Sequence, residues 1–499
     1  MAGFSQGGGV GLALSNWMVD GDPGYDIFAM DVARYGDFTS LRYTNAKVRE
    51  NYSRRFSIRF PNEELPAARP QQTTPLYDIM VRDNNAVMGD TWGLETPLWF
   101  APAGTPAEDL LSFHRSNDFE HVGNEVKAVR SAVGVTEIAN FAKYEFTGPG
   151  ATAFLDKLMT NRLPRPGRLC LTPMLNERGK LIGDFTIACA TPERYMMWGS
   201  SGAQIYHMRW FEQHLPKDGS VRIHRFGQTL VGLSIAGPKS RELLQRLVDW
   251  PVDNASLKFM DYREMDVAGC PTHLNRISYS GDLGYELWME PCYERRIYTE
   301  IKRLGADLGI VDFGMRALLS MRLEKNFPTW FAELRPIYGP YEADMGRFIK
   351  LDKGDFIGRD AAQAEKASGG SLRRVTLAID TDRTDVMAHE PIWARRTSVD
   401  KVDSAVVVPH GYGARRFDEN NTDYPKPAVQ SDGDWQVVGW VTSGGYGHSV
   451  GASLAQGYLP KALVSDSNSV FQVEILGKRF DAELVREPLF DPAREKMLS

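Results

Sequence analysis

The sequence contains few cysteines and no long apolar run. Its four cysteines, Cys170, Cys189, Cys270 and Cys292, lie far apart and form no C-x-x-C pair. This spacing argues against a zinc knot or a disulfide framework and fits a reducing compartment. No stretch approaches the ~18 uninterrupted apolar residues of a membrane-spanning helix, and the amino terminus shows no basic-then-apolar leader. We therefore expect a cytoplasmic protein with no membrane partner and no bound metal.

The net charge is small, and charges of both signs are mixed along the chain. The formal net charge is -6, and basic and acidic residues are interspersed, so there is no broad basic field for nucleic acid. The 499 residues are 42% hydrophobic and 24% charged, as in ordinary globular proteins. At a typical domain size of roughly 150 residues, the chain would contain about three domains.

The chain opens with the glycine-rich stretch "MAGFSQGGGVGLALSNWMVDGDP". A dinucleotide loop needs G-x-G-x-x-G between a strand and a helix, so that helix amides point at a pyrophosphate. Gly7, Gly8, Gly9 and Gly11 do not have that spacing, and only six residues precede Gly7. The stretch is therefore not a complete nucleotide site.

Three regions follow from composition and periodicity. Residues 1–70 form an aromatic and charged first segment, and residues 71–369 mix helical and alternating patterns. The small, polar "AEKASGGSLRR" marks a boundary near 370. Residues 370–499 are rich in strands, as in a small β-barrel or sandwich, with "RRFDENNTDYPKPAVQSDGD" as an exposed insertion. The fold class is α+β followed by an all-β domain.

Helices and hairpins are predicted within the middle region. Helical spacing occurs in "ATAFLDKLMTNRLP", "GPKSRELLQRLV" and "FGMRALLSMRLEKN". Strand pairs around polar turns are predicted in "RLCLTPMLNERGKLIGDFTIACA" and "HLNRISYSGDLGYELWME".

Six segments in sequence order resemble the folate-binding aminomethyltransferase family, the glycine-cleavage T-proteins. They are "FTGPGATAFLDKLMTN", "TPMLNERGKLIGDFTIA", "RISYSGDLGYELWM", "GMRALLSMRLEK", "LDKGDFIGRDA" and "GWVTSGGYGHSVGASLAQGYLP". The resemblance is closest to the carboxy-terminal half of dimethylglycine and sarcosine dehydrogenases. It implies three domains around a central folate channel, the last a β-barrel.

The same resemblance accounts for the opening stretch. In those dehydrogenases a glycine-rich turn and helix closes the FAD domain just before the folate half. Residues 1–70 look like that closing remnant and its connector, so FAD is not expected to bind this chain alone. The implied cofactor is tetrahydrofolate.

Glu286 is the first candidate for binding tetrahydrofolate. The pterin edge offers an amine and a ring N–H side by side, and a carboxylate can accept both as a bidentate pair. Glu286 in "GYELWM" stands at the matching position of the family pattern. The alternative is a glutamate on a solvated strand face.

Asp184 is the first catalytic candidate. It lies in "KLIGDFTIACA", a mostly apolar or small run in which a carboxylate must be partnered or functional, because burying an unpaired charge is costly. The family places an aspartate here, near the folate nitrogens that accept the carbon unit. Its implied role is to raise nucleophilicity and handle a proton. The alternative is an aspartate that bonds turn amides.

Other candidates are weaker. The family arginine corresponding to Arg316 approaches folate, where a guanidinium fork could serve the glutamyl carboxylate or a carbonyl oxygen, although an ion pair within its own helix is equally expected. Tyr279 and Tyr285 flank the "SGDLG" turn and are candidates to stack on the pterin. Tyr206, His207, Arg209 and Trp210 form a polar-aromatic cluster that could face a substrate.

The predicted function is transfer of a methyl or methylene group to tetrahydrofolate from a small methylated donor, such as dimethylglycine or sarcosine. A flavoprotein partner subunit could supply the carbon as an iminium or formaldehyde, or the chain could demethylate a donor directly. The alternatives are a folate-binding subunit or truncated part of a flavin-dependent dehydrogenase, or a non-catalytic folate-binding module. The non-catalytic branch carries a Cys-containing motif where this sequence reads "LDKGDFIGRD".

Overall fold

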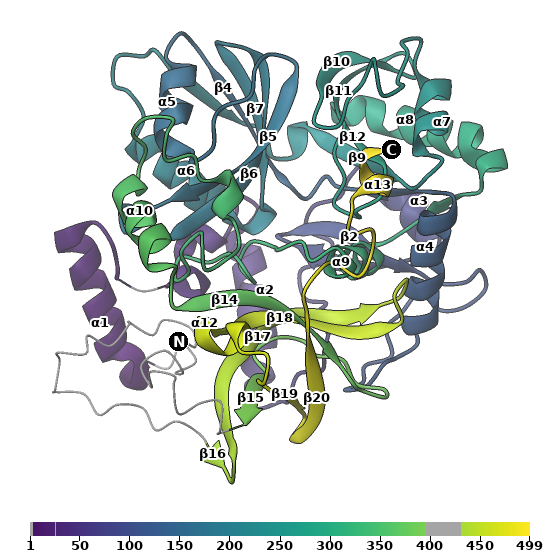
Figure 1. Cartoon of the computed structure of the whole chain (residues 1–499). Coiled ribbons are helices and arrows are strands. Elements are labelled where there is room, and N and C mark those ends of the chain that lie inside the picture. The colour runs from purple at the N-terminus through teal and green to yellow at the C-terminus, as the bar shows by residue number, and fades with distance from the viewer. Residues whose placement is uncertain (1–2, 25, 396–430) are drawn as a thin grey trace.

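The computed structural model describes residues 3–24, 26–395 and 431–499 (Figure 1). The described chain consists of an amino-terminal segment, a body built on two sheets, and a barrel. Among its helices, none combines the length and the apolar character that a membrane crossing requires.

The glycine-rich opening is a helix. The segment contains α1 (Gly3–Asp20), the short 3-10 turns Phe28–Met30 and Val32–Arg34, and α2 (Leu41–Ser53). A Cβ added at Gly7, Gly8, Gly9 or Gly11 would meet no atom within 4 Å. These glycines therefore make no close approach to other parts of the described chain.

One sheet of the body has six strands in the order β10-β11-β12-β9-β3-β13. Its strands are β3 (Val133–Glu137), β9 (Val231–Ala236), β10 (Tyr262–Val267), β11 (Cys270–Asn275), β12 (Gly284–Met289) and β13 (Ile310–Asp312). Only the β13–β3 pair is parallel. Its helices are α3 (Tyr77–Arg82), α4 (Phe119–Ser131), α7 (Ser240–Leu247) and α8 (Pro291–Gly305). Buried Leu244 of α7 and Ile297 of α8 join Leu287 of β12 in one apolar core.

The second sheet has five antiparallel strands in the order β5-β6-β7-β4-β8. Its elements are β4 (Ala142–Thr147), β5 (Arg168–Leu175), β6 (Leu181–Thr191), β7 (Arg194–Gly199), β8 (Arg222–Arg225), α5 (Ala151–Leu158), α6 (Gln204–Gln213) and α10 (Arg359–Ser368). The turn between β5 and β6 contains Gly179 at φ +70°, a left-handed conformation that favours glycine. This hairpin carries Asp184 and was predicted from the sequence.

The helix α9 (Met315–Glu324) connects the body to the barrel. It packs with the hairpin β1 (Ala86–Thr91) and β2 (Leu94–Phe100) and with α4 through Trp99, Val126 and Met321. On its other side, Ser320 Oγ donates a 2.7 Å hydrogen bond to the carbonyl of Tyr446 in the barrel. Such a helix is buried on several sides, which explains its weak amphipathic pattern.

The carboxy-terminal domain is a closed antiparallel barrel. Its strands are β14 (Leu372–Ile379), β15 (Pro391–Arg395), β16 (Ser431–Asp432), β17 (Trp435–Gly447), β18 (Ala452–Pro460), β19 (Phe471–Ile475) and β20 (Lys478–Val485), with α12 (Lys461–Ser465) beside them. The order β15-β19-β20-β14-β18-β17 is closed by pairing of β15 with β17. β14 begins two residues after the boundary expected at 370. Most of the predicted insertion falls in 396–430, outside the described residues.

Aspartates of the amino-terminal segment attach it to the body. Asp22, Asp26, Asp31 and Asp37 pair with arginines of the body, in the pairs Asp22–Arg178, Asp26–Arg335, Asp31–Arg209 and Asp37–Arg225. The Asp26–Arg335 pair is buried, with 1% and 8% of the two side chains exposed. The segment is therefore fixed to the body by a row of ion pairs.

The last residues after β20 cross from the barrel back to the six-stranded sheet and end in α13 (Glu495–Leu498) (Figure 1). The Phe490 ring lies 3.5 Å from the Arg130 guanidinium carbon, and Lys325 Nζ donates to Asp491 Oδ2 at 2.9 Å. These contacts tie the barrel to α4 and α9.

Candidate functional site

Glu286 lies on a face of β12 that is enclosed by protein but still in contact with open space. Its Oε2 accepts hydrogen bonds from Asn275 Nδ2 at 3.4 Å and from Trp288 Nε1 at 3.3 Å. No described residue donates to Oε1. Burial raises the pKa of Glu286 to about 7, although the hydrogen bonds from Asn275 and Trp288 oppose the shift. One carboxylate oxygen is thus anchored and the other is available.

Asp184 has a similar environment on β6 of the other sheet. Its neighbours Gly183 and Phe185 are buried, whereas Asp184 is only half-buried. Burial raises its pKa to about 6, and no other described residue donates a hydrogen bond to its carboxylate. A carboxyl group that is surrounded by protein but partly exposed to solvent, and that accepts no hydrogen bond from another residue, is a candidate for proton transfer.

Trp198 and Trp288 bring the two sheets together. Trp198 of β7 and Trp288 of β12 lie 5.8 Å apart between ring centroids, at an interplanar angle of 34°. Thr186, two residues after Asp184, pairs with Trp198 across the β6–β7 ladder. Because side chains two apart share a strand face, Asp184 and Glu286 belong to the two faces that meet at these tryptophans.

Tyr279, one of the two tyrosines expected near the pterin, is anchored at its hydroxyl. Its hydroxyl bonds the Pro328 carbonyl and Thr329 Oγ1, both at 3.0 Å. Burial raises the pKa of the Tyr279 hydroxyl, and its ring stacks on Phe327 with 6.0 Å between centroids. Its contact with a pterin stays a prediction.

Tyr285 does not lie with Glu286. It points to the opposite face of β12, is fully buried and packs in the helix-side core with Leu233 and Leu287. The alternation of a strand places neighbouring residues on opposite faces, so Tyr285 cannot stack on a ligand held by Glu286. The expectation for Tyr285 is corrected on this geometry.

Arg316 is engaged by two aspartates. Its Nη1 donates to Asp109 Oδ1 at 2.7 Å and to Asp118 Oδ2 at 2.8 Å, and its Nη2 donates to Asp109 Oδ2 at 2.7 Å. Trp99 Nε1 donates to the same Asp109. Both terminal nitrogens of the Arg316 guanidinium are thus hydrogen-bonded to aspartates of the protein. This leaves the predicted contact of Arg316 with folate without support.

The cluster predicted to face a substrate lies on α6 and contacts the amino-terminal segment. Arg209 pairs with Asp31 at 2.6 Å and its guanidinium lies 4.8 Å from the Trp17 ring, while Tyr206 packs edge-on against Phe28 at 5.6 Å. Trp210 instead packs on His214, 4.6 Å away, at the end of the helix. Tyr206 and Arg209 therefore hold the segment in place.

His207 has a different environment from the rest of that cluster. It is fully buried beside Phe185, on the face of β6 away from Asp184, and its Nε2 bonds the Ile182 carbonyl at 3.0 Å. Burial lowers its pKa to about 3, so the ring is neutral. This placement suits packing better than contact with the substrate of Asp184.

Sequence reasoning missed Asn275, Trp288 and Trp198. Asn275 faces Glu286 directly across the β11–β12 ladder, so correct strand registers would have revealed it. Strand alternation places Trp288 on the face of Glu286, but no local signal marks it as a donor to that carboxylate. Trp198 is paired with these residues only through the tertiary fold, and no local signal marks it.

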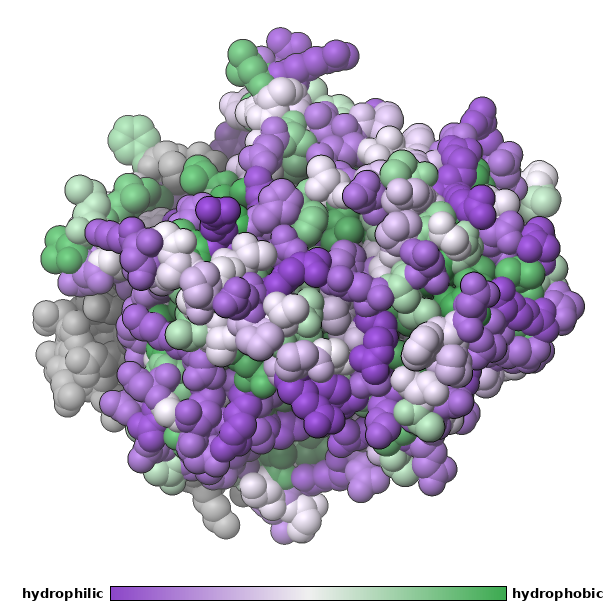
Figure 2. Space-filling model, turned by 90° about the horizontal axis from the view of Figure 1, so that it is seen from above, coloured by the Kyte–Doolittle hydropathy of each residue, from purple (hydrophilic) through white to green (hydrophobic). Residues whose placement is uncertain are grey.

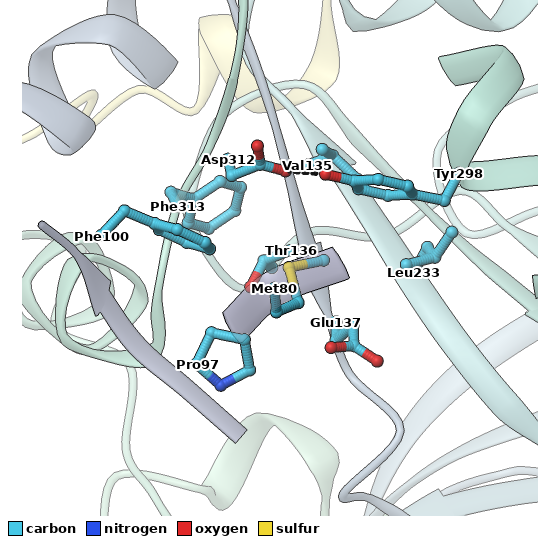
Figure 3. A pocket seen from close by; sticks show the side chains of 10 residues that line it. All are labelled: Met80, Pro97, Phe100, Val135, Thr136, Glu137, Leu233, Tyr298, Asp312 and Phe313. Carbon is cyan, nitrogen blue, oxygen red and sulfur yellow. Dashed lines mark hydrogen bonds between the residues drawn. The ribbon is translucent and has the colours of Figure 1, made fainter. Parts of the chain in front are cut away.

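A small pocket lies on the other side of the six-stranded sheet (Figure 3). Glu137, Tyr298 and Asp312 contribute its polar groups, and the Tyr298 hydroxyl donates to Asp312 at 2.8 Å. No water-sized sphere fits inside. We therefore place no ligand in this pocket. Among the residues that the structure describes, no group of three His, Cys, Asp or Glu side chains could hold a metal ion.

The fold is that of a glycine-cleavage T-protein. The aminomethyltransferase T of the glycine cleavage system from Bartonella henselae superposes with a TM-score of 0.66, at 20% identity, over 84% of this chain and 98% of that one. Residues 76–353 match the GCVT N-terminal domain and residues 416–491 the glycine cleavage T-protein C-terminal barrel domain. The chain belongs to the folate-dependent aminomethyltransferase family.

The curated relatives add a further relationship. Dimethylglycine dehydrogenase of Mus musculus, named as mitochondrial, is 33% identical over 99% of this chain and 53% of its own length. An aminomethyltransferase of Chloroherpeton thalassium is 31% identical over 53% of this chain and 72% of its own. A 4-methylaminobutanoate oxidase of Paenarthrobacter nicotinovorans is 27% identical over 99% of this chain and 56% of its own.

The chain thus spans about half the length of the dehydrogenase and oxidase relatives. Residues 20–74 match the FAD dependent oxidoreductase central domain, so the amino-terminal segment is a fragment of a flavin-enzyme domain. The cytoplasmic location stays a prediction.

Proposed function

We propose that the chain transfers a one-carbon unit, methyl or methylene, from a small N-methylated amino acid to tetrahydrofolate. The observation that carries the proposal is the pairing of Asp184 and Glu286, two enclosed but unsealed carboxylates, on facing sheets of an aminomethyltransferase-type domain. The names of the relatives favour this donor class, because dimethylglycine and 4-methylaminobutanoate are both N-methylated amino acids.

The residues present fit tetrahydrofolate. Glu286 keeps one carboxylate oxygen anchored by Asn275 and Trp288, and the other faces open space. A pterin amine and ring N–H would both donate to this carboxylate, as charge-assisted hydrogen bonds that orient the ring. Tyr279 would flank it. No residue of this chain is assigned to the folate tail or to FAD.

Asp184 is the proposed proton-handling residue. Bound tetrahydrofolate supplies the two amine nitrogens that accept the carbon. As the carbon passed from the donor amine to such a nitrogen, Asp184 would take the N–H proton at its carboxylate and return it to the departing amine, so bonds and protons would balance without an oxidant.

The oxidation level of the incoming carbon selects the product. A methyl group gives methyltetrahydrofolate. A carbon already oxidised to an iminium by a flavoprotein would give methylenetetrahydrofolate, in which both folate nitrogens hold the carbon and the second N–H proton leaves on the amine.

Two measurements test the proposal. Anaerobic titration with tetrahydrofolate, followed by tryptophan fluorescence, should saturate at micromolar concentrations. Incubation with tetrahydrofolate and dimethylglycine labelled with ¹³C in its methyl groups, with and without a flavin dehydrogenase, should then give labelled folate by mass spectrometry. Binding without any labelled product in either incubation would contradict catalysis and favour a folate-binding module.

A further inference from the structure

Lys143, on β4, has an amino group that is completely enclosed by protein. Lysine side chains usually keep this group in water, and hydrophilic residues are spread over the face of the molecule that Figure 2 shows. The exposed fraction of Lys143 is 0%, and it is among the largest fully buried side chains of the described chain. Because burying an ammonium group is costly, we looked for what surrounds it.

The amino group of Lys143 has few polar partners. Its Nζ donates a 2.7 Å hydrogen bond to the carbonyl of Ala139, in the connection between β3 and β4. It forms no ion pair with a described residue. Glu294 of α8 is the acid whose charge favours the ammonium, and neither of its own carboxylate oxygens has a hydrogen-bond partner among the described residues. The charge on Lys143 is therefore only weakly stabilised by hydrogen bonds and acids.

Two tryptophan rings lie next to this amino group. Lys143 pairs with Trp198 across the β4–β7 ladder, and residues opposite each other in a ladder project to the same face of the sheet. The Nζ atom lies 5.9 Å from the centroid of the Trp288 ring. The negative face of an indole attracts an ammonium at this distance, most strongly where water is excluded. Trp288 is only 1% exposed, so the contact is shielded from water.

Trp288 connects Lys143 to the candidate site. Its Nε1 donates to Glu286 Oε2 at 3.3 Å. The indole therefore has an ammonium beside its ring and a carboxylate at its N–H group. Since the N–H bond lies in the plane of the ring, any rotation of the ring changes the hydrogen bond to Glu286. Lys143 can thus influence Glu286 without touching it.

We propose that Lys143 is a positioning residue for tetrahydrofolate: its buried ammonium fixes the Trp288 ring in the orientation that donates a hydrogen bond to Glu286. The inference rests on the proposed function, because Glu286 is the carboxylate that would receive the pterin. Lys143 has no exposed surface, so it acts through Trp288 and not on the ligand itself.

The proton on Lys143 makes this positioning sensitive to pH. Burial lowers the pKa of Lys143 to about 7, and the Glu294 carboxylate opposes the shift. Glu137 of β3 acts on Glu294, whose pKa it raises, and not directly on Lys143. On the other side, β7 presents the uncharged Trp198 and β12 presents Trp288, with Glu286 beyond it. Lys143 should therefore lose its charge at a mildly alkaline pH.

Glu286 adds a second dependence on pH, in the opposite direction. Burial raises its pKa to about 7, and it must be ionised to accept two hydrogen bonds from the pterin. Tetrahydrofolate affinity should therefore fall on acidification as Glu286 gains a proton. It should also fall at alkaline pH as Lys143 loses one, with the tightest binding near neutral pH.

The first test measures the tetrahydrofolate affinity of the complete chain as a function of pH, by anaerobic fluorescence titration. Lys143→Met keeps the length of the side chain and removes its charge. At the pH of tightest binding its affinity should be lower by about 3- to 30-fold, the value of a cation–π contact. The fall at alkaline pH should disappear, whereas the fall at acidic pH should remain.

Lys353→Met is the matched control. Lys353 is also buried, with 3% of its side chain exposed, and its Nζ lies 5.7 Å from the Phe356 ring. Its Nζ also donates to Asp156 at 2.7 Å. Phe356 belongs to a different apolar core from that of Trp198 and Trp288. The control should therefore lose a buried ammonium and keep both limbs of the pH profile.

A second measurement needs no folate. The indole ¹⁵N–¹H signal of Trp288, identified by its absence in Trp288→Phe, reports on the surroundings of this ring. In Glu286→Gln, where residue 286 no longer titrates, the signal should still shift with a midpoint at a pH of about 7. The shift should vanish when Lys143→Met is added. Because Glu286→Gln keeps Lys143, this measurement is decisive even if Lys143→Met does not fold.

The outcomes separate this proposal from the proposed function. An alkaline limb that persists in Lys143→Met, or an indole signal that does not respond to pH in Glu286→Gln, would overturn the role of Lys143. Absence of tetrahydrofolate binding in both the unchanged chain and Lys353→Met would instead contradict the proposed function. A Lys143-dependent indole shift in those samples would still support the link between Lys143 and Trp288.

Discussion

Trp288 Nε1 donates to Glu286 Oε2 at 3.3 Å, from two residues further along the same face of β12. The ring that supplies this hydrogen bond also packs on Trp198 of the second sheet. The orientation of the carboxylate is therefore tied to the contact between the two sheets.

Replacing Trp288 with Phe should reduce tetrahydrofolate affinity. The phenyl ring would fill most of the space of the indole, and the carboxylate would lose a hydrogen bond worth about 0.5–1.5 kcal/mol. That bond lowers the pKa of Glu286, so its loss should raise the pKa above about 7. The pH at which affinity falls off on acidification should move upward in a titration series. An unchanged profile would mean that Trp288 does not position Glu286.

Glu286→Ala should weaken tetrahydrofolate binding by about 1.5–3 kcal/mol, roughly 10- to 150-fold, for a lost charged hydrogen-bond pair. Glu290→Ala, at an exposed position near the end of the same strand, is the control and should leave affinity unchanged. Equal affinities for the two variants would place the pterin elsewhere. Fluorescence titration measures both.

Asp184→Asn should leave folate binding intact and lower turnover by about 100-fold or more, the usual contribution of a positioned base. In the unchanged protein, the rate should rise with pH through about 6, because Asp184 must lose its proton before it can accept another. The variant should lose that limb of the pH profile. Turnover near that of the unchanged protein would remove Asp184 from the mechanism.

Asp26→Asn should destabilise the protein by about 3–5 kcal/mol, because it removes the negative charge that faces the buried Arg335 guanidinium. Asp22→Asn breaks the more exposed pair with Arg178 and should cost only about 0–1 kcal/mol. Urea unfolding followed by tryptophan fluorescence compares them. A similar loss of unfolding free energy in the two variants would show that the attachment of the segment does not depend on the buried Asp26–Arg335 pair.

Glu137→Gln should change how stability depends on pH. Burial raises the pKa of Glu137 to about 7, and its Oε1 has no hydrogen-bond partner. A carboxyl group whose pKa is higher in the folded than in the unfolded chain stabilises the fold at pH values below its unfolded-state pKa of about 4.5. This contribution is lost as the pH rises toward 7. The variant should be more stable at pH 7.5, with a flatter decline between pH 5 and 7. Exposed Glu120→Gln should leave the curve unchanged.

The sequence predicted much of this arrangement and failed where partners are distant. The β5–β6 hairpin, α5, α7, α9 and both candidate carboxylates followed from local periodicity and motif order. The environment of Arg316 did not, because Asp109 and Asp118 lie about two hundred residues earlier in the chain. Tyr285 was expected to stack on the pterin because it lies next to the turn. The alternation of the strand, however, already places it on the face opposite to Glu286.

The cysteines give the protein a practical property. Cys189 and Cys270 are buried, and burial raises the pKa of the Cys170 thiol to about 12, whereas Cys292 is exposed at the start of α8. Alkylating dyes react with accessible thiolates, so the unmodified chain should behave as a single-cysteine protein toward them. The label would attach three residues after β12, the strand that carries Glu286, and would give an optical reporter of ligand binding without any substitution.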